Sequence, residues 1–342
     1  MFLQSLLAFA ALVAASPITP VDEYAALIEQ RGWAYAIPRR YGPLPRSCTD
    51  YSSLKFYVQH AAAAYCNFNT PPGQPIVCQN SACPLVQQDQ PTVVASFVGQ
   101  FTGIGAYVAV DNARQEIVLS VRGSNNIRNF ITDLIFAWQA CDFAGNCRVH
   151  TGFAESWKEI QDAASLAITA ALGQNPGFRV VATGHSLGGA VATLGAAYLR
   201  QQGLSVDLYT YGAPRVGNED FANWMTSQPG GQWRVTHDND PVPRLPPIFF
   251  GYRHLSPEYW LANGQDAQND YPIGQVQKCM GIANTACNGG TFGLDVVAHL
   301  HYLTYVSACT GFPLKWKRGD PSDEELEQRL NAWSQKDQDL TK

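Results

Sequence analysis

Apolar positions along the chain recur with two periods, one typical of strands and the other typical of helices. Short runs rich in β-branched and aromatic residues predict strands over 105–110, 116–121, 178–182, 206–211 and 233–236. Apolar residues at helical spacing predict a helix over 152–172 that ends at Gly173, and a run of small residues predicts another helix over 187–199. Strands that alternate with helices indicate an α/β protein whose sheet is covered by helices.

The two ends of the chain depart from this alternation. Residues 1–16 combine an apolar stretch with small residues at its end, which predicts a secretory signal peptide although the usual positive start is missing. Residues 17–40 show no core pattern and end in a dibasic pair, so we expect a removed pro-segment. The tail, 312–342, is charged, and its Ser322…Glu325 spacing predicts a capped helix that packs on the body or is loosely ordered. The main domain then spans 41–311.

Composition narrows the class of protein. Hydrophobic residues make up 46% of the 342 positions, which is enough for a large core and excludes a disordered chain. Lys and Arg number 23 against 28 Asp and Glu, with no dense basic run, so a nucleic-acid partner is excluded. No apolar run reaches the roughly 18 residues that a transmembrane segment needs. We expect a compact, mildly acidic monomer.

Cysteine usage agrees with export. Three close pairs each span a short loop, which predicts the disulfides Cys78–Cys83, Cys141–Cys147 and Cys279–Cys287. Spacing alone does not set the pairing of the remaining three cysteines, which are Cys48, Cys66 and Cys309. The sequence contains no phosphate loop, dinucleotide fingerprint or metal-ligand spacing, so we expect neither a cofactor nor a metal.

The segment Gly184-His185-Ser186-Leu187-Gly188 fits the pattern G-x-S-x-G. It follows a predicted strand and opens a predicted helix, which is the context that a nucleophile elbow requires. Glycines flank the serine because so sharp a turn needs strained backbone angles and leaves no space for side chains. The helix N-terminus would offer positive potential and the Leu187 N–H to a developing oxyanion. A structural glycine-rich turn is the alternative, and we interpret Ser186 as the nucleophile.

A serine nucleophile needs a histidine base and an acid that orients the base. In this type of fold they follow in the order serine, acid, histidine. Asp238 and Asp240 come just after the predicted strand 233–236, where α/β sheets place functional groups. The Pro-Val-Pro run after Asp240 would fix its loop. Three histidines could act as the base: His254, His299 and His301.

Six short segments recur together, in this order, in one known family. They are 121–124, 184–189, 211–218, 240–246, 256–260 and 298–300. Over roughly residues 51–310 the chain resembles the secreted class 3 lipases of filamentous fungi. This resemblance implies an α/β-hydrolase fold, with a central, mostly parallel sheet covered by helices and a short helical lid.

The resemblance also implies roles for individual residues. The family triad falls on Ser186, Asp240 and His299, because the family's base precedes Leu-x-Tyr. Ser124 matches the family's oxyanion-hole serine, and the Leu187 N–H would be the second donor.

The resemblance to the fungal lipases also implies which cysteines pair. It supports Cys66–Cys309 in addition to Cys78–Cys83 and Cys141–Cys147. Cys279 and Cys287 depart from the family, so their pairing rests on spacing, and Cys48 is then the odd thiol.

Residues 127–136 lie between Ser124 and the Cys141 loop. Their apolar residues follow helical spacing and form one face: Ile127, Phe130, Ile131, Leu134 and Ile135. The family carries its mobile lid at this place, so the resemblance implies a flap that exposes this face at an oil–water interface. A fixed helix that buries the same face is the alternative, and periodicity does not separate the two.

We therefore expect a secreted serine hydrolase that cleaves triacylglycerols in lipid droplets or emulsions through an acyl-enzyme. The apolar lid face favours long acyl chains over aromatic acids. One alternative is an esterase of the same fold for soluble feruloyl or short-chain esters, and another is a mono- and diacylglycerol lipase. An inactive lipid-binding relative is a third, but the complete set of serine, acid and histidine speaks against it.

Overall fold

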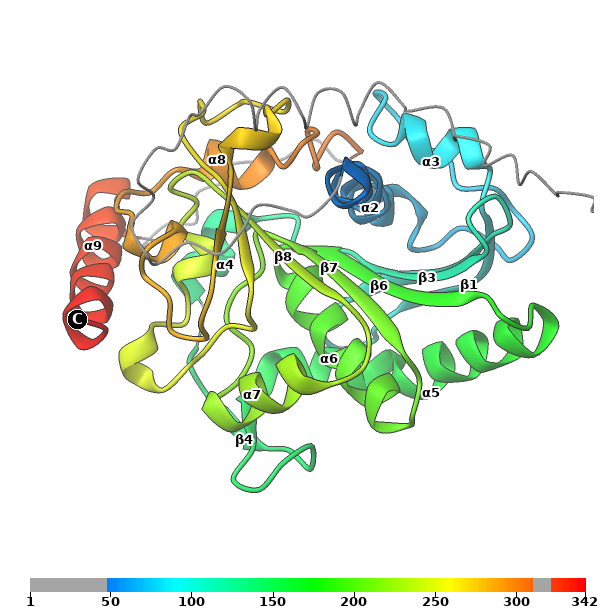
Figure 1. Ribbon diagram of the computed structural model, residues 1–342, viewed down its shortest axis with the longest axis horizontal. Coiled ribbons are helices and arrows are strands. Elements are labelled where there is room, and N and C mark those ends of the chain that lie inside the picture. Colours follow the sequence, from blue (N-terminus) through cyan, green and yellow to red (C-terminus); the bar gives the residue numbers. More distant parts are fainter. Residues whose placement is uncertain (1–47, 134, 310–320) are drawn as a thin grey trace, which may run out of the picture. The chain divides into compact units, whose positions relative to one another are not determined.

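The structure is a computed structural model and describes residues 48–133, 135–309 and 321–342. Its main sheet contains β1 (Thr92–Val98), β2 (Gly105–Asp111), β3 (Glu116–Val121), β6 (Arg179–His185), β7 (Val206–Tyr211), β8 (Gln232–His237), β9 (Glu258–Leu261) and β10 (Val276–Cys279). These strands are neighbours in this order (Figure 1). The pairs from β3 to β9 are parallel, whereas β1–β2, β2–β3 and β9–β10 are antiparallel. A separate two-stranded sheet joins β4 (Trp138–Ala140) to β5 (Arg148–His150).

Helices cover both faces of the main sheet. The helix α2 (Cys48–Asn67) lies on one face, and α5 (Thr151–Gln174) and α6 (Leu187–Gln201) lie on the other (Figure 1). The shorter helices and the final one are α3 (Pro84–Asp89), α4 (Ile127–Asp133), α7 (Glu219–Ser227), α8 (Val296–Leu300) and α9 (Asp323–Leu340). Single 3₁₀ turns form η1 (Val242–Arg244), η2 (Ile248–Phe250), η3 (Ile273–Gln275) and η4 (Asn288–Gly290).

Alternate residues of each strand supply two separate cores. In β2, Ala106 and Val108 pack in the core under α5 and α6, whereas Tyr107 and Ala109 pack in the core under α2. Successive side chains of a strand point to opposite faces, so a strand covered on both sides buries all of them. This is why the central strands are continuous apolar runs in the sequence.

The observed architecture confirms the predicted fold class. Each of the five predicted strands and both predicted helices overlap an observed element. The sequence analysis missed β1, β9 and β10, because β1 is half-exposed and the other two strands have only four residues each. β1 and β10 are the two edges of the main sheet, and β9 lies next to β10.

Four disulfides join the cysteine pairs that the sequence analysis expected. They are Cys66–Cys309, Cys78–Cys83, Cys141–Cys147 and Cys279–Cys287. The first of them links residues 243 positions apart and ties the end of α2 to the segment after α8. The side chain of Cys48 lies outside the described residues.

The predicted signal peptide, 1–16, and pro-segment, 17–40, also lie outside the described residues, so the division of the chain stays a prediction. Within the tail, the predicted capping box is present at the start of α9. The Ser322 hydroxyl accepts from the Glu325 N–H at 3.2 Å, and the Glu325 carboxylate accepts from the Ser322 N–H at 2.8 Å. Across the described ranges, we find no helix with the length and apolarity needed to cross a membrane.

Candidate active site

Ser186 lies in the turn between β6 and α6, with φ of 58° and ψ of −132°. A positive φ is uncommon for a residue with a side chain and is typical of strained functional turns. Close packing enforces this turn. A Cβ atom on Gly184 would overlap the backbone of Gly188, and one on Gly188 would overlap the Val121 carbonyl of β3. Both glycines are therefore required for the two strands and the helix to meet here.

His185, the residue before the serine, is fully buried, and both of its ring nitrogens form hydrogen bonds. Nδ1 lies 2.8 Å from the Tyr65 hydroxyl, and Nε2 lies 2.8 Å from the backbone oxygen of His299. Burial lowers the pKa of His185 well below its ordinary value, and the neighbouring His299 adds to this shift. The ring is thus neutral, with Nε2 donating to the His299 carbonyl and Nδ1 accepting from Tyr65. His185 thereby links the elbow directly to the backbone of His299.

Asp240 follows β8, and His299 belongs to α8. Both side chains are fully buried, and His299 Nδ1 lies 2.8 Å from Asp240 Oδ2. The Tyr302 hydroxyl donates to the same oxygen at 2.5 Å, and the Val242 N–H donates to Oδ1 at 2.8 Å. Because a carboxylate only accepts hydrogen bonds, His299 Nδ1 carries the proton and Nε2 of the neutral ring can accept one.

Two residues that the sequence analysis did not single out hold this acid in place. Burial and the Asp240 charge raise the pKa of Tyr302 well above its usual value, so its hydroxyl stays a donor. On the other side, the Asn288 side-chain amide donates to the backbone oxygens of Asp238 and Asp240, both at 3.0 Å. Asn288 directly follows the Cys279–Cys287 disulfide. Its only sequence signal is a polar residue beside a cysteine, and that signal is weak.

Ser186 Oγ and His299 Nε2 are both buried, and neither has a hydrogen-bond partner within the described part of the chain. Buried polar atoms are nearly always paired, so two open atoms need an explanation. The turn that carries Ser186 and the helix that carries His299 meet at His185, whose ring lies 4.6 Å from that of His299, centroid to centroid, and whose Nε2 bonds the His299 backbone oxygen. The arrangement can pass a proton from a serine hydroxyl to a histidine held by a carboxylate.

The two expected oxyanion donors border the same turn. Gly123 lies so close to the elbow that a Cβ atom there would be 3.2 Å from Ser186 Cβ, and Ser124 comes next. The Ser124 hydroxyl now contacts its own loop, at 3.2 Å from the Asn126 nitrogen. Leu187 is the first residue of α6. Its N–H is one of the first-turn N–H groups, which have no acceptor within the helix.

The predicted lid region forms α4, and only part of its predicted apolar face is covered. Ile135 was predicted to share this face, but the helix ends at Asp133 and Ile135 is 76% exposed. Ile127 and Ile131 are buried against Val242 and Leu245 of the Asp240 loop and against two leucines of α9, Leu326 and Leu330. Phe130 is partly buried against the same cluster and also packs on Phe153 of α5, with ring centroids 6.5 Å apart. Leu134 lies outside the described residues. The cover over α4 therefore comes in part from the C-terminal tail.

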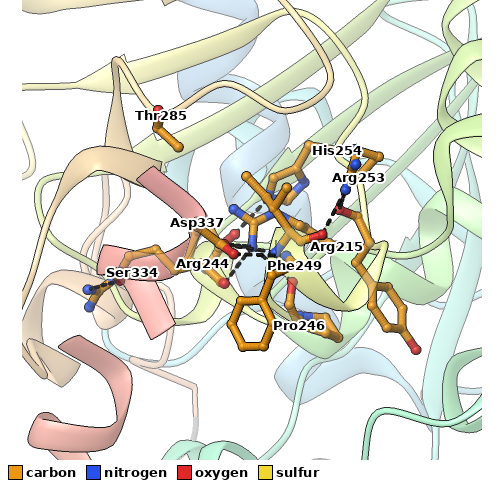
Figure 2. Close-up of polar contacts among 12 residues, drawn as sticks. Arg215, Arg244, Pro246, Phe249, Arg253, His254, Thr285, Ser334 and Asp337 are labelled. Atoms are coloured by element: carbon orange, nitrogen blue, oxygen red, sulfur yellow. Dashed lines mark hydrogen bonds and ion pairs between the residues drawn. The ribbon is translucent and has the colours of Figure 1, made fainter. Parts of the chain in front are cut away.

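The helix α9 is anchored by a buried carboxylate, as Figure 2 shows. Asp337 accepts from Arg215 Nη1 at 3.2 Å and from the N–H groups of Ile248 and Phe249 at 2.8 and 3.0 Å. At the start of α9, the Asp323 carboxylate pairs with the Arg128 guanidinium of α4 at 2.9 Å. These contacts place the tail against the body of the protein and against α4.

A cavity of about 410 Å³ borders the elbow. Its wall includes Leu187 beside Ser186, Phe130 and Ile135 from the lid region, and Phe153 and His150 at the start of α5. Most of this wall is apolar, which suits an acyl chain. Elsewhere, three potential metal ligands lie together among the described residues, Cys66, Cys78 and Cys309, but all three are in disulfides and have no thiolate to offer.

We compared the sequence and the structure of this chain with those of known proteins. Residues 118–250 match the family model described as lipase (class 3). The secreted mono- and diacylglycerol lipase 1 of Fusarium solani is 51% identical over 100% of this chain and 99% of its own length. The chain belongs to the class 3 lipase family. Two solved structures agree with this. The mono- and diacylglycerol lipase of Aspergillus oryzae, 35% identical, covers 78% of this chain and 100% of its own with a TM-score of 0.73. The triacylglyceride lipase of Rhizomucor miehei, 29% identical, covers 77% and 98% with a TM-score of 0.67.

As a class 3 lipase, the protein has the α/β-hydrolase fold that the resemblance implied. It is a hydrolase of carboxylic esters that acts on lipids, and it is secreted, in agreement with its four disulfides. The resemblance to secreted fungal lipases, noted from six short segments, is thereby confirmed. The relatives include both partial-glyceride lipases and a triacylglyceride lipase, so they support lipid ester hydrolysis without fixing the substrate.

Proposed function

We propose that the protein hydrolyses acylglycerol esters in two steps on Ser186. His299 Nε2 removes the proton of the Ser186 hydroxyl as Oγ attacks the ester carbonyl, and Asp240 stabilises the resulting imidazolium. The alcohol leaves with the proton from His299, and water then cleaves the acyl-enzyme by the same route. The observations that carry this proposal are the strained elbow, where Ser186 Oγ has no partner among the described residues, and the equally unpaired Nε2 of a histidine bonded to a buried carboxylate.

The tetrahedral oxyanion would be held by the Leu187 N–H and by Ser124. The Ser124 hydroxyl now donates to the Asn126 backbone oxygen at 3.3 Å, and it would have to give up this bond in order to donate to the oxyanion. Loss of one such donor typically lowers the rate by a factor on the order of 10²–10³. Ser124→Ala is therefore expected to lose most of its kcat while KM changes little.

For the substrate, we propose mono- and diacylglycerols, hydrolysed by a monomer. The relative that is 51% identical over the whole chain carries that substrate class in its name, and so does the Aspergillus oryzae structure. The apolar cavity beside Leu187 suits their acyl chain. Triacylglycerol, the first expectation from the sequence, stays the second candidate because the Rhizomucor miehei relative is a triacylglyceride lipase.

Hydrolysis rates of mono-, di- and trioleoylglycerol, measured on both sides of the solubility limit, test this proposal. Faster cleavage of the two partial glycerides supports it. A rate that jumps when droplets form, with trioleoylglycerol cleaved as fast as the others, would favour the triacylglycerol alternative. Saturation below the limit, with activity on methyl ferulate only, would instead indicate an esterase for soluble substrates. Gel filtration tests the monomer.

A further inference from the structure

His150 ends β5 and is the residue just before α5. A side chain at this position often caps the helix by accepting from its first N–H groups, but the His150 side chain forms no such bond. Its ring instead stacks on Phe153, with centroids 4.1 Å apart, and lies 6.1 Å from the ring of Tyr252. Tyr252 in turn stacks on Trp138 at 3.7 Å. Aromatic packing therefore fixes the imidazole in one orientation.

Both ring nitrogens of His150 are buried without a hydrogen-bond partner in the described part of the chain, and the residue is only 5% exposed. Burial lowers the pKa of His150 to about 4, and the nearby Ile135 backbone opposes part of that shift without forming a bond of normal geometry. The positive end of α5 disfavours a cation as well. The ring is thus neutral at pH 7 and carries one unused donor and one unused acceptor.

His150 lines the 410 Å³ cavity that also borders Leu187, but its two nitrogens have almost no exposed surface. A ligand in the cavity would bind them once the neighbouring wall, which includes Ile135, moves aside. The other polar groups of this wall have less to offer a ligand. The Ser156 hydroxyl donates to the Gly152 carbonyl at 2.8 Å, Glu155 is exposed, and Thr151 is only half-buried. His150 is therefore a buried polar group in an apolar wall, next to the position where the ester carbonyl would be held.

We infer that His150 binds a free hydroxyl group of the glycerol in a mono- or diacylglycerol. This inference rests on the proposed function. In a partial glyceride the free hydroxyl lies within a few bonds of the scissile ester, so both can reach one cavity. A hydroxyl donates and accepts, and so it can pair with either nitrogen of a neutral imidazole. An ester only accepts, so a triacylglycerol leaves the acceptor nitrogen of His150 buried and unpaired. A site with such a group discriminates against substrates that lack the hydroxyl.

The test compares kcat/KM for three octanoyl esters: monooctanoylglycerol, trioctanoylglycerol and p-nitrophenyl octanoate. We expect His150→Phe to lower the kcat/KM for monooctanoylglycerol about tenfold relative to the kcat/KM for trioctanoylglycerol, and about tenfold relative to that for p-nitrophenyl octanoate. One buried hydrogen bond with its unpaired partner is worth about that factor. His150→Gln, which keeps a donor and an acceptor, should recover most of the ratio. Ile135→Val, which changes an apolar side chain of the same wall and keeps the aromatic packing of His150, should alter the ratio by less than about twofold.

A purely structural role of His150 predicts that all three rates fall together in His150→Phe and His150→Gln. If the kcat/KM ratios between the substrates stay constant in this way, the inference is wrong. Thermal unfolding of both variants shows whether the fold is kept. If His150→Phe does not fold, the His150→Gln and His150→Asn ratios decide, since only Gln has the reach of the imidazole Nε2.

Binding gives a readout that is independent of turnover. The Ser186→Ala protein is titrated with 1-O-octylglycerol and with its 2,3-dimethyl ether, which lacks free hydroxyls. We expect the Ser186→Ala protein to bind the hydroxyl form about tenfold more tightly, and Ser186→Ala with His150→Phe to bind both forms alike. Equal binding of the two ethers by Ser186→Ala would contradict the role of His150. Undiminished hydrolysis by Ser186→Ala would contradict the proposed function instead, so the two failures are distinguishable.

Discussion

The nucleophile elbow and helix α4 border the same cavity, yet different forces hold them. At the elbow, glycines without space for a side chain and fully paired buried groups fix a strained serine. At α4, apolar side chains from the Asp240 loop and from α9 cover Ile127 and Ile131, and one partly exposed ion pair adds to them. The proposed nucleophile therefore lies where the backbone is over-determined, whereas α4 is held by contacts that can be exchanged.

The largest expected effect comes from the elbow. Ser186→Ala removes the nucleophile and should lower kcat for p-nitrophenyl butyrate by a factor on the order of 10⁶. The hydroxyl has no partner in the described structure, so the melting temperature should change little. Calorimetry beside the kinetic assay checks both parts. Residual activity within tenfold of the wild type would remove Ser186 from the mechanism.

Asp240→Asn comes next in size. An amide at this position can donate to His299 Nδ1 and so favour the wrong tautomer, which typically costs about 10⁴ in kcat. Tyr302→Phe is its matched control, because it removes a hydrogen bond from the same oxygen and leaves the carboxylate. It should lower kcat by far less. Equal losses in the two variants would show that orientation of the carboxylate, and not its charge, dominates.

A stability effect of intermediate size is expected where α9 is anchored. Asp337→Ala leaves Arg215 buried without its ion pair and two N–H groups without an acceptor, which should cost about 3–5 kcal/mol in the free energy of unfolding. Urea denaturation measures this cost. The exposed carboxylate Asp339, on the same helix, supplies the control variant Asp339→Asn. If α9 holds α4 closed, Asp337→Ala should also raise the rate on soluble esters relative to emulsions.

The smallest effect is expected at the ion pair between α9 and α4. Asp323 is largely exposed, so Asp323→Asn should cost at most about 1 kcal/mol in the free energy of unfolding, less at high salt. Urea denaturation at two salt concentrations resolves this. A cost comparable to that of Asp337→Ala would mean that the ion pair, and not apolar packing, holds α4.

The contrast between these regions also explains what the sequence could predict. The elbow depends on five consecutive residues and two flanking elements, so local spacing was enough to identify it. The choice of His299 over two other histidines needed the family resemblance, because no local pattern separates them. Nothing local indicates that Leu326 and Leu330 cover Ile127 and Ile131, since these contacts join segments almost 200 positions apart.

The sequence analysis also did not predict the contacts of buried polar residues around the candidate active site. Neither His150 nor Asn288 has a motif around it that predicts its partners, whereas Tyr302 is the tyrosine of the Leu-x-Tyr segment after His299. Tyr302 lies three positions after His299, which could have suggested a shared site. For His150, only the structure reveals that its two ring nitrogens are buried and unpaired among the described residues, and that the residue lines a cavity.

The disulfide Cys66–Cys309 closes a covalent ring that contains Ser186, Asp240 and His299. Tension applied at either end of the oxidised chain would reach this bond before it reached the main sheet. The helix α9 lies outside the ring. A single proteolytic cut after Cys309 would therefore free the helix from the chain that carries the three residues, whereas a single cut within the ring would leave its two fragments covalently joined.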